Sequence, residues 1–147
     1  MTPYEDVFKA FLNKIQDNLY VELTEADTIE DLTGLLNSAI TYFSYPKVDI
    51  RDKDDDGQYF NVTLGIDEIE ILVLGMLIEW MKRELRSVDA LRQSMTTKDF
   101  NTYSQASHIN ALVKASAAER AELKRKLVRY SVRGADGTSQ FSVLGGD

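Results

Sequence analysis

Residues 67–85 read DEIEILVLGMLIEWMKREL, and this stretch decides the fold. Its middle, residues 71–78, is apolar apart from one glycine, so a helix here has almost no polar side. A helix that is apolar all round is normally packed on several sides. Asp67 at its start and Lys82 near its end suit the helix dipole. We therefore predict a central buried helix over 67–85, in which Gly75 allows a close helix crossing.

Two helices are predicted before this central helix. Thr2 is a plausible N-cap for the first, because Pro3 suits the first helical position, and this helix should run to about residue 19. Thr28, with Asp31 in the capping-box position, is predicted to open the second helix, which ends at Pro46. The apolar stripes are Val7, Phe8, Phe11, Leu12, Ile15 and Leu19 in the first helix, and Leu32, Leu35, Leu36, Ala39, Ile40 and Phe43 in the second.

Two further helices are predicted after it. Ser87 is expected to cap a short fourth helix, and a fifth begins between Asp99 and Ser104 and ends near Tyr130. The apolar stripe of the fifth is Ile109, Leu112, Val113, Leu123, Leu127 and Tyr130. Its outer face is basic and consists of Lys114, Arg120, Lys124, Arg125, Lys126 and Arg129. This face is the candidate surface for a neighbouring subunit or another partner.

The segment near 47–62 alternates like extended chain, and Asp56-Gly57 predicts a small hairpin. Asp52, Asp54, Asp56 and Gly57 also match the first half of a calcium-binding loop. The twelfth position of such a loop needs a glutamate, but Thr63 stands there. A solvated acidic turn is the favoured interpretation, and these three aspartates are a weak candidate for a cation site.

The sequence changes character at residue 134, where a glycine-rich tail begins. Phe141, Ser142 and Val143 alternate as a strand does, so the tail is either disordered or a strand that orders on the sheet edge of a partner. The predicted organisation is thus a helical domain over 1–133 and an extended tail over 134–147. The fold class is mainly α, a compact bundle of four to five helices around the central one.

Composition and charge limit the function. The chain has 147 residues, which suits one domain, and no cysteine, which excludes disulfides and thiolate metal sites. The longest apolar run, 71–78, is too short to span a bilayer, so no membrane association is predicted. Residues 1–79 hold 17 acidic and 5 basic residues, a charge of −12, and residues 80–147 hold 7 and 12, a charge of +5, which together give −7. Either two exposed helix faces simply differ, or copies or partners meet end to face.

No catalytic or cofactor site emerges from the sequence. His108 is the only histidine, and a Ser104–His108 pair on one helix resembles no common hydrolase arrangement. A helix-surface ion pair with Lys82, three residues on, or Arg83, four residues on, accounts for Glu79. The basic face could bind nucleic acid, but the negative total charge favours an acidic protein partner instead. We therefore predict a protein that is not an enzyme.

Several short pieces of the chain occur together in an informative order. They are Tyr59-Phe60-Asn61, Glu68-Ile69-x-Ile71-Leu72, Met76, Glu79-Trp80, Asp99-Phe100 and Tyr103-Ser104-Gln105-Ala106. From about Tyr4 to Tyr130 the chain resembles the head-tail connector, or adaptor, proteins of tailed bacteriophages. The resemblance implies a helical neck protein of the virion, whose copies form a ring beneath the portal, usually a dodecamer.

Such an adaptor extends the DNA channel without sequence-specific DNA binding and offers a platform to tail or stopper proteins. In several adaptors an extended C-terminal segment inserts into the portal, which here implies Phe141, Val143 and Leu144 as portal anchors. The alternative is a small phage accessory or regulatory protein that uses the basic face within 114–133 to bind nucleic acid or an acidic protein.

Overall fold

The computed structural model describes residues 1–15, 23–94 and 102–133, and it is mainly helical. In chain order the elements are β1 (Thr2–Pro3), α1 (Tyr4–Leu12), α3 (Glu25–Tyr42), β2 (Lys53–Asp54), β3 (Tyr59–Phe60), α4 (Ile66–Ser94) and α5 (Thr102–Val132). The mainly α fold class is therefore confirmed. The predicted tail, with Phe141, Val143 and Leu144, lies outside the described residues.

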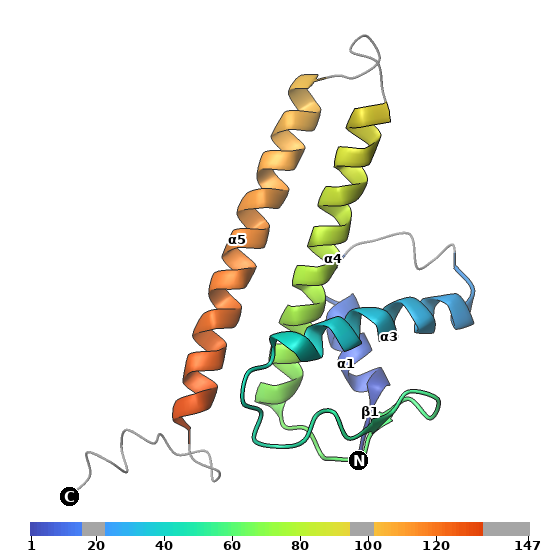
Figure 1. Cartoon of the computed structure of the whole chain (residues 1–147), viewed down its shortest axis with the longest axis vertical. Coiled ribbons are helices and arrows are strands. Elements are labelled where there is room, and N and C mark those ends of the chain that lie inside the picture. The colour runs from blue at the N-terminus through green and yellow to red at the C-terminus, as the bar shows by residue number, and fades with distance from the viewer. Residues whose placement is uncertain (16–22, 95–101, 134–147) are drawn as a thin grey trace, which may run out of the picture.

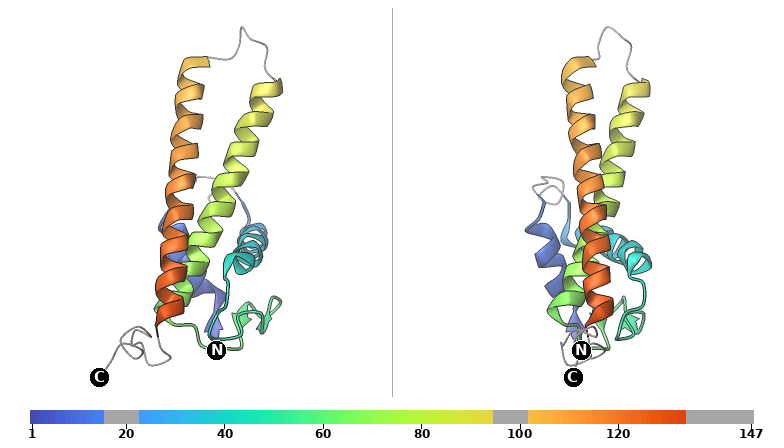
Figure 2. Two further views of the ribbon diagram at one scale, coloured as in Figure 1. Left: turned by 60° about the vertical axis from the view of Figure 1, so that its left-hand side comes forward. Right: turned by 90° about the vertical axis from the view of Figure 1, so that its left-hand side faces the viewer.

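Helix α4 is the axis of the molecule. It contacts α1, α3 and α5, and its residues 71–78 are all buried, as the apolar run predicts. Helix α5 lies along α4, and α1 and α3 pack on α4 from opposite sides in the right-hand view of Figure 2. The upper halves of α4 and α5 extend beyond the other elements as a two-helix arm (Figure 1).

The predicted break at Ser87 is wrong, because α4 continues unbroken to Ser94. Residues 82–94 contain no glycine or proline and are rich in lysine, arginine, glutamate and leucine, which favour helix. A serine alone does not end such a run, and Ser87 lies exposed in the interior of the helix.

The predicted hairpin is confirmed, and it gains a strand from the N-terminus. Strands β2 and β3 pair antiparallel, with Lys53 opposite Phe60, and β1 adds to the other edge of β3, with Thr2 opposite Phe60. The predicted capping role of Thr2 is therefore wrong. Its hydroxyl accepts a hydrogen bond from the backbone amide of Leu64 at 2.9 Å, and α1 begins two residues later at Tyr4.

Two other helix ends differ from the predictions. Helix α1 ends at Leu12 rather than near residue 19, although Ile15 beyond it is still buried. Helix α3 begins at Glu25, because Thr24 caps it by accepting a hydrogen bond from the Asp27 amide at 3.1 Å. Asp31, the predicted capping partner of Thr28, instead pairs with Arg83 of α4 at 2.5 Å.

Helices α3 and α4 cross closely at Gly75, as predicted. A Cβ atom added there would lie 2.9 Å from the Cβ and 3.0 Å from the Cα of Ala39. Only a residue without a side chain fits this crossing at the present separation, and the contact brings the most apolar part of α4 directly onto α3.

The hairpin is held to the helices through Asp55. Its carboxylate accepts hydrogen bonds from the Tyr4 hydroxyl at 2.5 Å, from the Lys53 ammonium at 2.5 Å and from the Asn37 amide at 3.4 Å. These donors, with Lys53 the strongest cause, hold the pKa of Asp55 below its usual value although partial desolvation opposes them. Burial and the nearby carboxylate raise the pKa of Tyr4.

Acid should therefore weaken the hairpin attachment. Because the folded pKa of Asp55 is depressed, its stabilisation is present above the unfolded pKa and is lost as pH falls through the folded value. The urea midpoint should fall as the pH is lowered below the usual pKa of an aspartate, and Asp55→Asn should reduce this fall. Asp56→Asn is the matched control, since Asp56 is exposed in the same turn. An equal reduction in both variants would contradict the role of Asp55.

Candidate functional site

Helix α5 is attached to α4 along one narrow row. Its fully buried residues in the described part, Ser116, Leu123 and Tyr130, are seven positions apart, the spacing of a coiled-coil seam. The other positions of this row hold half-buried residues, which are Ile109, Leu112, Glu119 and Lys126. Among the described residues, the buried hydroxyl of Ser116 has no hydrogen-bond partner. Most of the circumference of α5 is therefore open to a partner.

Val113 corrects the predicted apolar stripe of this helix. The sequence pattern assigns it to the buried face, but 51% of it is exposed. The residues of the seam follow one another in steps of three and four residues. Val113 comes directly after Leu112 in the sequence, so it lies beside this row and not in it. Leu127 is half-buried at the margin of the seam. The sequence pattern does not distinguish an exposed apolar residue such as Val113 from a buried one.

The predicted basic residues of α5 fall into two groups. Arg125 pairs with Glu122 on the same helix at 2.6 Å, and Lys126 approaches Glu70 of α4 at 3.8 Å. The other four are exposed and form no ion pair within the described parts of the chain, and they are Lys114, Arg120, Lys124 and Arg129. Cations that stay exposed and unpaired remain free to meet an external anionic group.

A shallow groove lies on this open face, and we call it the α5 groove. Its lining residues are Ala121, Lys124, Arg125, Val128 and Arg129. Val128, which is 56% exposed, and Ala121 supply the apolar surface, and the three cations surround it. An apolar strip with a basic rim suits a partner that is apolar at its centre and acidic at its edges.

Helix α3 has a net charge opposite in sign to that of α5. Helix α3 contains four acidic residues and no basic one, a charge of −4, whereas α5 contains six basic and two acidic residues, a charge of +4. A second surface depression, the α3 groove, is lined by Asp27, Glu30, Asp31, Gly34, Leu35 and Arg83. Helices α3 and α5 both pack on α4, and the two grooves have no lining residue in common.

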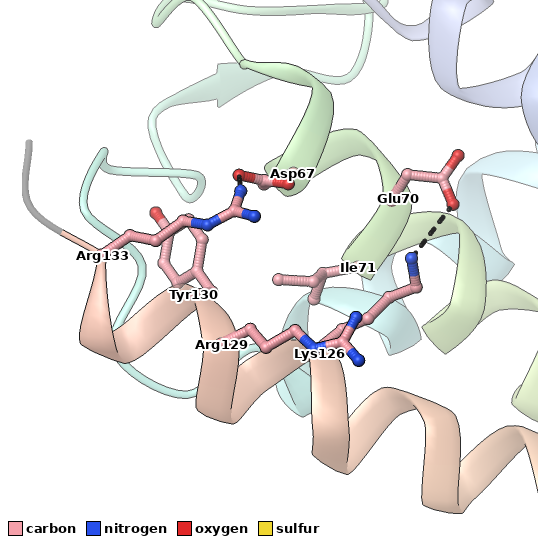
Figure 3. A pocket seen from close by; sticks show the side chains of 7 residues that line it. All are labelled: Asp67, Glu70, Ile71, Lys126, Arg129, Tyr130 and Arg133. Atoms are coloured by element: carbon pink, nitrogen blue, oxygen red, sulfur yellow. Dashed lines mark hydrogen bonds and ion pairs between the residues drawn. The ribbon is translucent and has the colours of Figure 1, made fainter. Parts of the chain in front are cut away.

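A small pocket of about 150 Å³ lies between the start of α4 and the end of α5 (Figure 3). Arg133 pairs with Asp67 at 2.6 Å at one end, and Lys126 with Glu70 at the other. Tyr130 and Ile71 line it between these pairs, as does Arg129 (Figure 3). Its walls carry three cations and two carboxylates, and the described chain ends beside it at Arg133.

Tyr130 is the anchor of this end of α5. Its hydroxyl accepts a hydrogen bond from the Lys47 amide at 2.8 Å and donates one to Glu68 at 3.2 Å. Its ring meets Phe43 edge-on at 5.1 Å. Burial is the main cause that raises the pKa of Tyr130, although the Lys47 amide opposes it. The residue therefore joins α5 to the loop after α3 and to the first turn of α4.

A polar brace joins α3 to α4 at Glu79. Its carboxylate accepts hydrogen bonds from Tyr42 at 2.5 Å and from Lys82 at 3.1 Å, and Lys82 also donates to the Tyr42 hydroxyl. Burial raises the pKa of Glu79, but these donors outweigh it and the net pKa is lowered. The predicted Glu79–Lys82 pair is confirmed, whereas the participation of Tyr42, 37 residues away, had no local signal.

Two of the three candidate aspartates, Asp52 and Asp54, accept hydrogen bonds within the hairpin. Asp54 accepts hydrogen bonds from the amides of Asp56 and Gly57, both at 3.0 Å, and Asp52 accepts one from the Asn61 side chain at 2.7 Å. In the described segments, no three carboxylate or histidine side chains come together in a way that could hold a metal ion. The local geometry is that of a side-chain-capped turn.

The remaining candidates add no chemistry to these surfaces. His108 is exposed on α5. None of the helices, as far as the structure describes them, combines the length and apolar character that a membrane crossing requires.

Comparisons of the chain with known protein families, with curated proteins and with solved structures find no match, so its function is inferred from the two charged faces.

Proposed function

We propose that this protein is a structural component of a phage virion, a head-tail adaptor whose copies form a ring beneath the portal, extend the DNA channel and dock the tail. The observation that carries the proposal is the opposite charge of the α3 and α5 sides of one helical body. A surface that complements a different surface on the same molecule forms head-to-tail contacts, and such contacts close into rings when the rotation allows.

The attachment of α5 also supports an assembly role. A single seam holds this helix, so its outer face is free along the described turns. Each contact in a ring can be weak, because repetition makes the whole assembly strong. In this proposal the protein acts in the virion neck, needs no cofactor and contacts the passing DNA without reading its sequence.

The tail supplies the expected portal contact. Purified protein is mixed with the portal of the same genome and imaged by negative-stain electron microscopy. Wild type should add a ring of density beneath the portal, whereas a variant without residues 134–147 should leave the portal bare. Replacing Phe141, Val143 and Leu144 with alanine should have the same effect, because these apolar side chains are the proposed anchors.

Circular dichroism on each variant is the control, since the helical domain should be unchanged by a change in the tail. Density beneath the portal with all three anchors replaced would contradict the role of the tail. Bare portals with the wild-type protein would contradict the adaptor function itself.

The second candidate is a small regulatory binding protein that uses the basic face of α5. The four exposed cations without an ion pair in the described chain favour it. Binding to duplex DNA would weaken steeply with salt and would weaken again in a Lys124→Glu variant, because phosphate contacts release counterions. This candidate takes precedence if the portal remains bare.

A further inference from the structure

We propose that the α5 groove of one copy docks onto the α3 groove of the next copy, head to tail. This inference rests on the proposed adaptor function for its biological setting and names the subunit contact that a ring requires. It assigns the contact to two defined surfaces of the same chain, with Val128 and Gly34 at its centre.

Both grooves contain apolar surface that a partner would cover. Val128 is one of the most exposed apolar residues of the described chain and lines the α5 groove. Gly34 is exposed and lines the α3 groove, and an added Cβ atom there would meet nothing within 4 Å, so there is open space beside it. Leu35 beside it is buried and apolar. A projecting valine over a glycine lets two helices approach closely and covers apolar surface that water otherwise contacts.

The rims of the grooves are complementary in charge. Lys124 and Arg129 on α5 form no ion pair within the described residues, and neither do Asp27 and Glu30 on α3. Bringing the rims together places unpaired cations opposite unpaired carboxylates. Complementary rims of this kind fix the register of a contact and raise its association rate.

The position of the grooves identifies a second copy as the occupant. The two surfaces are complementary in charge, but they are separate grooves with no shared lining residue, so each is open to a second molecule. An isologous dimer that used only one of the two grooves would place like charges together, either cation on cation at α5 or carboxylate on carboxylate at α3. The heterologous contact avoids this repulsion and leaves one free groove at each end, so it continues from copy to copy.

The absence of cysteine from the sequence makes a direct test possible. Gly34→Cys and Val128→Cys variants are mixed at high protein concentration, with and without portal, and treated with a short bis-maleimide. A Gly34–Val128 heterodimer should form, whereas either variant alone should give about tenfold less dimer. A chain that carries both cysteines should give a ladder of covalent oligomers.

Two controls separate this contact from chance collision. Val113→Cys is the matched control for Val128→Cys, because it is equally exposed on the same helix but lies outside the groove. Its yield with Gly34→Cys should be about tenfold lower. Glu30→Lys should suppress the heterodimer, and Lys124→Glu on the other partner should restore it, because the rim charges are then exchanged.

The outcomes distinguish the docking from the adaptor function. Equal yields with Val113→Cys, preferred Val128 homodimers, or no heterodimer with or without portal would each overturn the docking. If wild type adds a ring to portals but the cysteines do not link, the adaptor function stands and the docking is wrong. If the cysteines link but portals remain bare, the docking stands and the adaptor function is wrong.

Discussion

Replacing Tyr130 with alanine is expected to lower the free energy of unfolding by about 3–5 kcal/mol, which is a large part of the stability of a typical domain. The side chain is 4% exposed, packs edge-on against Phe43 and holds both Lys47 and Glu68 through its hydroxyl. Its removal opens a cavity and breaks the lower attachment of α5. Urea unfolding followed by the fluorescence of Trp80, the only tryptophan, measures the loss.

Two control variants divide this loss into its parts. Tyr130→Phe keeps the ring and removes the hydroxyl, so it should cost about 1–2 kcal/mol. Tyr45→Ala removes a tyrosine that is 89% exposed and should change stability by less than about 0.5 kcal/mol. If Tyr130→Ala costs no more than Tyr130→Phe, the ring does not anchor α5.

Replacing Gly75 with alanine is expected to destabilise the fold by about 1–3 kcal/mol. The new methyl group would lie 2.9 Å from the Ala39 Cβ, 3.0 Å from its Cα and 3.2 Å from its carbonyl oxygen. Two of these three atoms are backbone, so α3 must move away from α4. This cost exceeds the gain of about 1 kcal/mol that alanine normally brings to a helix. Thermal unfolding by circular dichroism measures the difference.

Gly34→Ala is the matched control, because it makes the same change in α3 at a position with open space. Without a clash, only the helix propensity remains, and the variant should gain about 0.5–1 kcal/mol. The two substitutions should therefore have opposite signs. A gain in both would show that the helices separate at Gly75 without cost.

The central part of the fold was predictable because its signal is long. The apolar run over 71–78 identifies the buried axis, and within it Gly75 indicates the close crossing. Helix ends were less predictable because capping signals repeat. Thr24 and Thr28 are each followed three residues later by an aspartate, so the sequence offers two possible starts for α3. The structure distinguishes them, because Asp31 pairs with Arg83 of α4.

The pairing of β1 with β3 had no readable signal. A two-residue strand is too short to show alternation, and its partner lies 58 positions away, since Thr2 pairs with Phe60. The same chain segment carries a good capping pattern at Thr2, Pro3 and Glu5, so local preference pointed to a helix start. Tertiary contact with the hairpin overrides this preference.

The residue types of the candidate site were predictable from the sequence, but their arrangement in space was not. The six basic residues of α5 are evident from the sequence, yet their exposure depends on which row of the helix meets α4. The prediction places Val113 on the wrong side for that reason. The α3 groove needs Gly34 and Arg83 to lie near each other, and residues 49 positions apart on two helices give no local pattern.

The single seam that holds α5 also determines how the molecule comes apart. Helices α1 and α3 contribute nine buried apolar residues to the core around α4, whereas the described side chains of α5 add only Leu123 and Tyr130 to the same core. Elements with few buried apolar contacts open at a lower free energy than the global transition. The described part of α5 is therefore expected to open locally at a lower free energy than α1 and α3, without unfolding of the rest of the molecule.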